Sequence, residues 1–377
     1  MAAFLFVGAV AAAIMWVALL LLPWQPWRTR ERLNSIQSPP TADPGVGVTA
    51  VVPARNEAAH IRQTLAGLRE QSAQLRILIV DDQSTDDTAN IARSVPDVEV
   101  LAGQPLPMGW TGKLWALHQG IAEVRTPFVL LVDADITLGS GVLAALRDRQ
   151  AGSGAGLVSV MASLAMESFW EQLLMPAFVY FFKLIYPFAL ANGTCKRFHA
   201  GAGGCMLLRA DALDAVGGVA SLREAVIDDC TIARRIKDAG YRIWIGLSRQ
   251  VVSTRRYRRL SDTWAMVART AYTQLGESPW ALLACTAAMV ASLLVPVAAL
   301  LLSTDLQTRL AALIALAAMA ISYAPTIRFY GLPWALALTL PPVASLYLAM
   351  TWSSAWSSWR GIRARWKDRE YARIVTR

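Results

Sequence analysis

Residues 128–135 read Phe-Val-Leu-Leu-Val-Asp-Ala-Asp. The run of apolar residues predicts a short strand that is buried on both faces, and Asp133 and Asp135 follow it directly. Two carboxylates separated by one residue can reach a single hard cation from a turn, and Mg²⁺ and Mn²⁺ prefer such oxygen ligands. An ordinary acidic turn explains the same residues equally well, because aspartate is common in turns.

Comparable elements surround this strand. Further strands are predicted at 46–52, 76–80 and 98–101, and helices at 56–71, about 86–93 and 114–123. The strand at 46–52 is expected to end at Pro53, because proline often marks a turn. Strands that alternate with helices indicate an α/β domain with a mainly parallel sheet and helices on both faces.

Polar residues follow the predicted strands. They lie at 53–57, at Asp81 and Asp82, and at 133–135. In open α/β sheets, ligands bind at the carboxyl edge of the strands, where these residues should meet. Asp81 and Asp82 stand at the strand end itself and could hydrogen-bond a base or a ribose.

The composition points to a membrane. The chain is 55% hydrophobic and only 17% charged. Four long stretches contain no charged residue at all: 1–24, 280–302, 310–327 and 329–359. A membrane-spanning helix needs about 20 apolar residues, so the first two stretches qualify, whereas the third is short. The fourth is interrupted by prolines. The predicted organisation is a transmembrane anchor at 1–27, a domain at 40–260, a transmembrane block at 280–359 and a basic tail at 360–377.

The basic residues near the first stretch orient the chain. They follow the apolar run and none precedes it, which favours an uncleaved anchor over a signal peptide. The positive-inside rule then places the α/β domain in the cytoplasm. The chain has a net charge of +9, and its basic residues lie largely beside apolar segments, as at 255–259 and 360–373. This pattern suits anionic lipid headgroups better than nucleic acid.

Four ordered motifs resemble the family 2 glycosyltransferases of the GT-A fold, over about residues 45–260. They are Val51–Glu57, Asp81–Asp86, the Asp-x-Asp motif at 133–135, and Ile227–Arg235 leading into Gly240–Arg242. The one departure is Asp228, where this family usually has glutamate. The resemblance implies a GT-A-type, Rossmann-like sheet domain combined with transmembrane helices in a bacterial inner (cell) membrane.

The element at 109–113, Gly-Trp-Thr-Gly-Lys, and the flanking apolar stretches narrow the resemblance. They are similar to the hopanoid- and carotenoid-associated members, which glycosylate polycyclic or polyisoprenoid lipids. The resemblance implies inverting, metal-dependent transfer of one sugar from a nucleotide-sugar donor to the hydroxyl of a membrane lipid. A Gln-x-x-Arg-Trp motif, typical of polymerising members, does not follow residue 242. A polyprenyl-phosphate acceptor and a non-catalytic nucleotide-binding scaffold stay open as alternatives.

The resemblance also implies roles on the donor side. Pro53, Arg55 and Glu57 would line the nucleotide pocket, where Asp82, beside Asp81, would contact the base. Asp133 would meet the ribose or the metal, and Asp135 would hold the Mg²⁺ or Mn²⁺ that bridges the diphosphate. The charge of Lys113 could offset the same diphosphate, although a surface lysine beside a Trp-Gly turn explains this residue equally well.

An inverting transfer needs a base to take the proton of the acceptor hydroxyl. Asp229 is the candidate, and Asp228 could raise its pKa by like-charge repulsion. Adjacent helical residues do not face each other, so only one of the two is expected to point into the cleft. An acidic pair that complements a helix dipole is the alternative.

Two further segments bear on the acceptor. The resemblance places Gly203 and Gly204 of the run at 201–204 beside the acceptor, whereas a tight turn into a strand is the alternative. Residues 168–190 are aromatic-rich but include Glu171 and Lys183. We expect an interfacial helix there or a buried core helix, but not a single span, because the motifs on either side must share one compartment. Four spans in total would place the basic tail outside, whereas a re-entrant fourth stretch would keep it inside.

Overall fold

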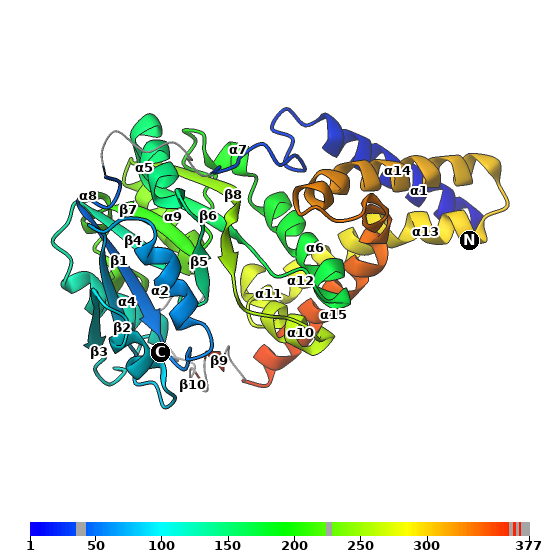
Figure 1. The fold of residues 1–377 in the computed structure, drawn as a ribbon. Helices are drawn as coiled ribbons and strands as arrows, with labels where there is room; N and C mark the ends of the chain where they lie inside the picture. Colours follow the sequence, from blue (N-terminus) through cyan, green and yellow to red (C-terminus); the bar gives the residue numbers. More distant parts are fainter. Residues whose placement is uncertain (35–42, 224–227, 362–364, 367–368, 371–377) are drawn as a thin grey trace. The chain divides into compact units, whose positions relative to one another are not determined.

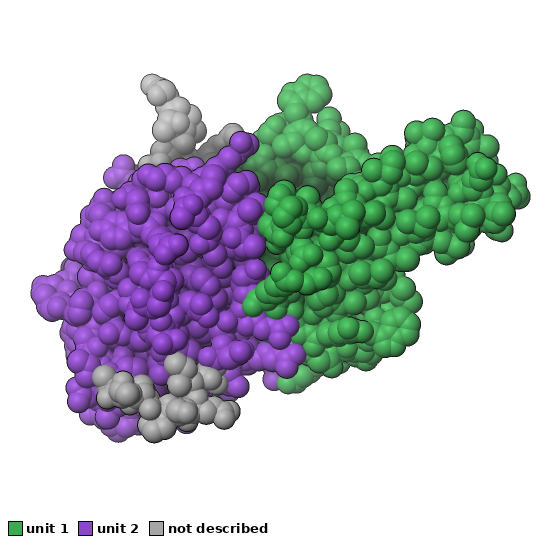
Figure 2. All heavy atoms as spheres, turned by 90° about the horizontal axis from the view of Figure 1, so that it is seen from above, with its two compact units in different colours: residues 1–30, 166–185, 257–364 green, residues 31–165, 186–256, 365–377 purple. Residues whose placement is uncertain are grey.

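The computed structural model describes residues 1–34, 43–223, 228–361, 365–366 and 369–370. The chain divides into two compact units, coloured separately in Figure 2. The helical unit comprises Met1–Arg30, Met166–Ile185 and Tyr257–Ala364, and the sheet unit comprises Glu31–Ala165, Tyr186–Arg256 and Arg365–Arg377. The predicted domain at 40–260 is therefore interrupted by a segment of the helical unit. Most of the predicted basic tail, and Ile227 of the fourth motif, lie outside the described residues.

The sheet unit is built on an eight-stranded sheet with the order β3-β2-β1-β4-β7-β6-β8-β5. The strands are β1 (Val48–Ala54), β2 (Arg76–Asp81), β3 (Val98–Ala102), β4 (Phe128–Val132), β5 (Ile136–Leu138), β6 (Ala155–Ser163), β7 (Cys205–Arg209) and β8 (Arg242–Ser253). Strands β3, β2, β1 and β4 are parallel, as are β6 and β8. Strand β7 runs antiparallel to both of its neighbours, and β5 is antiparallel to β8. The α/β fold is confirmed, and its antiparallel part was not anticipated.

One strand boundary differs from the prediction. Pro53 was expected to end the first strand, but β1 continues through Ala54, and Pro53 lies opposite Val80 of β2. A proline loses only its N–H and keeps its carbonyl acceptor, so a strand can include it near its end.

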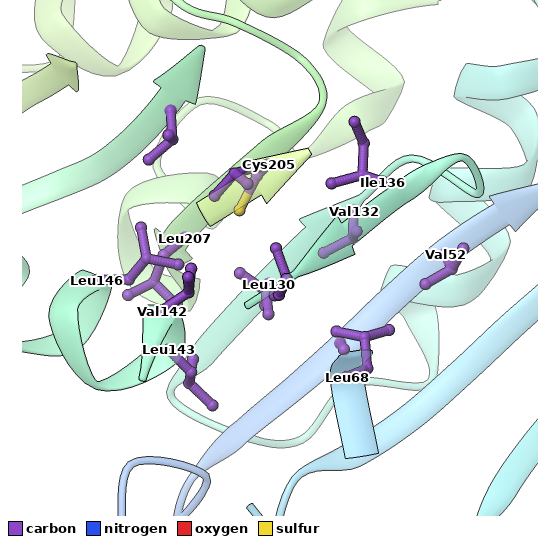
Figure 3. Close-up of a cluster of buried hydrophobic side chains, with 14 of the residues drawn as sticks. Val52, Leu68, Leu130, Val132, Ile136, Val142, Leu143, Leu146, Cys205 and Leu207 are labelled. Atoms are coloured by element: carbon purple, nitrogen blue, oxygen red, sulfur yellow. The ribbon is translucent and has the colours of Figure 1, made fainter. Parts of the chain in front are cut away.

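Helices cover both faces of the sheet, as predicted. They are α2 (Ile61–Arg69), α3 (Thr88–Arg93), α4 (Gly112–Ala122), α5 (Val142–Ser153), α7 (Phe188–Ala191), α8 (Ala210–Asp214), the 3₁₀ helix η1 (Val219–Leu222) and α9 (Asp228–Asp238). Side chains alternate between the faces of a strand, so Val52 packs with α2 and α5 whereas Val51 packs with α4 and α9. Figure 3 shows the first of these two cores, with Val52, Leu68 and Leu143 among its members. The sheet thereby lies between two layers of helices.

The helical unit contains the apolar stretches. Its elements are α1 (Ala2–Leu21), α6 (Phe169–Ile185), α10 (Leu260–Ala268), α11 (Ala271–Gln274), α12 (Pro279–Met289), η2 (Val290–Leu294), α13 (Val295–Leu302), α14 (Leu306–Phe329), η3 (Trp334–Thr339) and α15 (Leu340–Trp359). Figure 1 shows α1, α13 and α14 side by side. Four stretches of the described chain are long and apolar enough to cross a membrane: Ala2–Leu21, Pro279–Leu302, Leu306–Phe329 and Trp334–Trp359.

The third stretch is longer than its uncharged core suggested, because α14 extends through Arg309 and Arg328 near its two ends. Long basic side chains near the ends of a membrane helix can reach the interface. Four stretches match the larger number of spans considered from the sequence. The side of the membrane on which each loop lies stays a prediction.

Helix α6 packs on α14 and α15 within the helical unit. Its two charged residues are buried and hydrogen-bonded. Glu171 accepts from the backbone N–H groups of Ser168 and Tyr257, at 2.9 and 2.8 Å, and Lys183 donates to the carbonyl of Arg28. This packing supports a buried helix, and an interfacial location stays a prediction.

The short strands β9 (Arg365–Trp366) and β10 (Arg369–Glu370) pair with each other.

Candidate active site

The strand ends predicted to carry chemistry come together at one edge of the sheet. Strand β1 lies between β2 and β4 and is parallel to both, with Ala54 opposite Asp81. Asp133 follows β4, and its N–H donates to the carbonyl of Gly204 at 3.1 Å. The glycine run before β7 therefore closes the same edge.

The loops after β1 and β2 are tied to each other. Arg55 donates through Nη1 to the carbonyls of Asp82 and Gln83, at 2.6 and 3.0 Å. The N–H of Glu57 donates to Thr88 Oγ1 at 2.7 Å. Asp82 is fully buried, whereas Asp81 is partly exposed, so Asp81 is the more accessible of the two to a ligand.

Lys113 lies among carboxylates. Its Nζ is 2.8 Å from Asp133 Oδ1 and 3.5 Å from Asp228 Oδ2, and its side chain is only 22% exposed. Of the two interpretations of Lys113, this position supports a role in the site over that of a surface lysine. Burial opposes the charged form, but the carboxylates of Asp133 and Asp228 outweigh it and raise the pKa of the ammonium above its usual range.

The candidate base is held by backbone donors at the start of α9. Asp229 Oδ2 accepts from Gly203 N at 3.0 Å, and Oδ1 accepts from Cys230 N at 2.7 Å. Burial, followed by repulsion from Asp228, raises the pKa of Asp229 to about 6. A carboxyl in this range is ionised near neutral pH yet basic enough to take a proton.

Glycine is required at position 201, where the run at 201–204 meets the backbone of Asp229, and the space at 203 and 204 is tight. A Cβ on Gly201 would lie 2.3 Å from the carbonyl oxygen of Asp229, and a Cβ on Gly203 would lie 3.3 Å from Lys113 Nζ. A Cβ on Gly204 would lie 3.2 Å from the side chain of Ile136. The run therefore lets backbone approach the carboxylates closely.

One expectation about the acidic pair is wrong. Only one of Asp228 and Asp229 was expected to point into the cleft, but both line the same small cavity. They are the first residues of α9, where the chain enters the helix, so Asp228 reaches Lys113 while Asp229 meets Gly203. The cavity has a polar end and apolar walls, lined among others by Pro53, Leu114, Met206, Leu222 and Ile232.

Asp135 contacts the end of β8. Its Oδ2 accepts from Ser253 Oγ at 3.0 Å and from Arg255 Nε at 3.1 Å. Arg255 also donates through Nη2 to Glu57 Oε1 at 2.7 Å. From the sequence, Arg255 was grouped with basic residues that suit lipid headgroups. Its position on the two site carboxylates corrects that interpretation, because the antiparallel pairing of β5 with β8 brings residue 255 to Asp135.

The acidic side chains at this edge of the sheet could bind a divalent cation together with other ligands. Among the residues that the structure describes, no group of three or more His, Cys, Asp or Glu side chains could hold a metal. Asp133 and Asp135 supply carboxylate oxygens, the ligand type of Mg²⁺ and Mn²⁺. Mg²⁺ commonly takes one or two carboxylates and completes its shell with water and substrate phosphates. The residues thus fit a cation completed by the substrate, not a closed protein cage.

Comparisons with known proteins agree with this architecture. The model of glycosyl transferase family 21 matches residues 11–372. A 4,4'-diaponeurosporenoate glycosyltransferase of Staphylococcus aureus (strain MRSA252) is 32% identical over 126 residues, which is 33% of this chain and 34% of the relative. The same enzyme of strain USA300 is 31% identical over the same length. The match thus spans about a third of the length of these curated relatives.

The fold has a solved counterpart. The mannosyltransferase PcManGT from Pyrobaculum calidifontis, in complex with GDP-Man and Mn²⁺, superposes with a TM-score of 0.56 and 21% identity, covering 94% of this chain and 99% of that one. This likeness confirms the GT-A fold expected from the motifs. The expected resemblance to membrane-bound glycosyltransferases is confirmed as well. Because the family model matches almost the whole chain, the protein belongs to glycosyl transferase family 21.

Proposed function

We propose that this chain is an inverting glycosyltransferase that moves one sugar from a nucleotide-sugar donor to the hydroxyl of a membrane lipid, such as a carotenoid, a hopanoid or a similar isoprenoid. The observation that carries the proposal is Asp229. This partly buried carboxylate has a raised pKa and backbone donors on both oxygens, in a cavity shared with Lys113 and Asp133. The relatives named for a carotenoid substrate and the four apolar stretches support the lipid acceptor.

The donor would bind at the carboxyl edge of β1, β2 and β4. Pro53, Arg55 and Glu57 would line the nucleotide pocket, with Asp81 and Asp82 beside the base or ribose. Asp133 and Asp135 would hold Mg²⁺ or Mn²⁺, which supplies positive charge that stabilises a departing nucleoside diphosphate. Lys113 would add a fixed positive charge at the same place, because it already lies 2.8 Å from Asp133.

The acceptor would enter beside Gly203 and Gly204. Its hydroxyl oxygen attacks the anomeric carbon as the bond from that carbon to the diphosphate oxygen breaks, and the proton passes to Asp229. Attack on the face opposite the leaving group inverts the anomeric centre. The apolar walls of the cavity suit an acceptor whose hydroxyl is attached to a hydrocarbon skeleton.

This position of Asp229 favours a hydroxyl acceptor over a polyprenyl phosphate. A phosphate acceptor is already an anion and needs no base, whereas the raised pKa of Asp229 matches the task of taking a proton. We place the enzyme as a multi-pass protein of the bacterial inner (cell) membrane with its catalytic unit in the cytoplasm, because the basic residues Arg28, Arg30 and Arg32 follow the first apolar stretch.

The test incubates membranes that contain the protein with labelled UDP- and GDP-sugars and extracted isoprenoid lipids, with and without EDTA. We expect label in a lipid that resists mild acid and carries the anomeric configuration opposite to that of the donor. No labelled lipid with any donor would leave a non-catalytic scaffold and refute the proposal. Label that mild acid releases would indicate a glycosyl phosphate, and label unaffected by EDTA would remove the metal role.

A further inference from the structure

The contact between Arg255 and Asp135 is supported by hydrogen bonds of the residues that precede Arg255. The N–H and the hydroxyl of its neighbour Thr254 both donate to the carbonyl of Asp135, at 2.7 and 3.0 Å. The Ser253 hydroxyl donates to Asp135 Oδ2 at 3.0 Å and accepts from Arg255 N at 3.3 Å. The chain after β8 is therefore fastened around Asp135, which keeps the backbone of Arg255 beside the carboxylate that its guanidinium contacts.

The guanidinium joins two acidic side chains that are less exposed than itself. Arg255 is 32% exposed, Asp135 15% and Glu57 8%, with contacts of 3.1 and 2.7 Å. The planar fork of an arginine suits such a bridge, because its several N–H groups have fixed directions. Arg255 thus neutralises the carboxylate of Asp135, which is the residue that the proposed function assigns to a divalent cation.

We infer that Arg255 and the divalent cation compete for Asp135, so that the site binds the cation well only together with a diphosphate. A cation at Asp135 would lie close to a guanidinium of like charge, and like charges at short distance repel strongly where water is partly excluded. A diphosphate removes this conflict, since it offers the guanidinium new anionic oxygens. Arg255 is then a positioning residue that couples the binding of the metal to that of the donor.

This inference rests on the metal and donor parts of the proposed function, but its test needs no sugar transfer. Mn²⁺ binding to the full-length protein in detergent is measured from the electron paramagnetic resonance signal of free Mn²⁺, without nucleotide. Asp135→Asn identifies the signal that belongs to this site. Arg255→Gln should bind Mn²⁺ about tenfold more tightly than the wild type, which corresponds to about 1.4 kcal/mol.

A matched control separates local competition from loss of overall charge. Arg69→Gln removes an arginine from an exposed pair with Asp97, whose atoms are 3.5 Å apart, and it should leave the affinity for Mn²⁺ unchanged. Arg255→Lys keeps the charge but lacks the planar fork of N–H groups that holds both carboxylates in fixed directions, so its affinity should lie between those of the wild type and Arg255→Gln. An unchanged or weaker affinity in Arg255→Gln, or in Arg255→Lys where Arg255→Gln does not fold, overturns the inference.

A second measurement tests the coupling itself. Adding UDP or GDP should raise the Mn²⁺ affinity of the wild type more than that of Arg255→Gln, because linkage between two ligands is reciprocal and passes here through Arg255. An equal increase in both proteins overturns the coupling. A protein that shows these shifts but labels no lipid would refute the glycosyl transfer while the competition at Asp135 stands.

Discussion

Lys113 Nζ lies 2.8 Å from Asp133 Oδ1. The same ammonium lies 3.5 Å from Asp228, so one lysine connects the carboxylate after β4 with the acidic pair that begins α9. The proposed donor side and the proposed base therefore share one positive charge. A substitution of Lys113 should therefore affect both the departure of the diphosphate and the removal of the acceptor proton.

Replacing Lys113 with methionine should lower kcat/KM for glycosyl transfer by about 100-fold, a size typical of losing one group that stabilises developing negative charge. Methionine keeps much of the chain length but removes the charge between Asp133 and Asp228. Steady-state kinetics on extracted lipids measures the change. Lys196→Met is the control, since Lys196 is exposed and donates to the carbonyl of Asp238, away from the site carboxylates; an equal loss in both variants would contradict the assignment.

Replacing Asp229 with asparagine should abolish transfer, by at least about 100-fold, while UDP or GDP binding persists. An amide can still accept from Gly203, but it cannot take a proton from the acceptor. Transfer and nucleotide binding are measured on the same preparation. Asp238→Asn changes an exposed aspartate near the end of the same helix and should remain active. Turnover retained in Asp229→Asn would assign the base to another group.

The pH dependence of transfer follows from the same carboxyl. Asp229 acts as a base only when ionised, and its pKa is raised to about 6 by burial and by the charge of Asp228. The value of kcat/KM should therefore be constant above this pH and fall as the pH drops through about 6. Asp228→Asn removes the repulsion, so the midpoint should shift to lower pH.

The pH profile of Asp238→Asn is the comparison, and its midpoint should equal that of the wild type. Two results would contradict the assignment: no fall in kcat/KM at low pH, or a fall whose midpoint is the same in Asp228→Asn as in the wild type. Either result would show that the ionisation of Asp229 does not control the rate.

Local patterns in the sequence were sufficient for the parallel half of the sheet. The apolar run at 128–132 and the polar residues after it became β4 and Asp133, because a strand buried on both faces needs a continuous apolar run. A strand after the glycine run at 201–204 was one of the alternatives, but the place of β7 in the sheet was not anticipated. Its antiparallel pairing with β4 and β6 joins residues that are distant in the chain, and no local pattern specifies such a partner.

The same limit explains Arg255. Within its own segment it is one basic residue among several at 255–259, and that pattern alone indicates a charged surface. Its contact with Asp135 joins residues that are 120 positions apart in the chain. The signal that could have identified it is its place immediately after β8, since residues that follow a sheet strand often reach the site at the sheet edge.

Nothing in the sequence indicated that Lys237 is buried and contributes to the fold. Replacing this residue provides a test of stability. It lies on α9 and is 3% exposed, and its Nζ donates to the carbonyls of Ala191 and Phe198, at 2.6 Å each. Lys237→Met would leave both carbonyls without this donor in a buried place. Each such loss costs about 1–3 kcal/mol, so with two carbonyls the free energy of unfolding should fall by about 2–6 kcal/mol.

Thermal unfolding of the purified protein in detergent measures this effect, and the melting temperature of Lys237→Met should be clearly lower than that of the wild type. Lys196→Met again serves as the control, because an exposed lysine with one carbonyl partner can exchange that partner for water. Unfolding is the appropriate measurement here, since Asp229 lies on the same helix and a loss of transfer would not separate the two residues. Equal melting temperatures for the two variants would show that Lys237 does not hold the segment at 191–198 against α9.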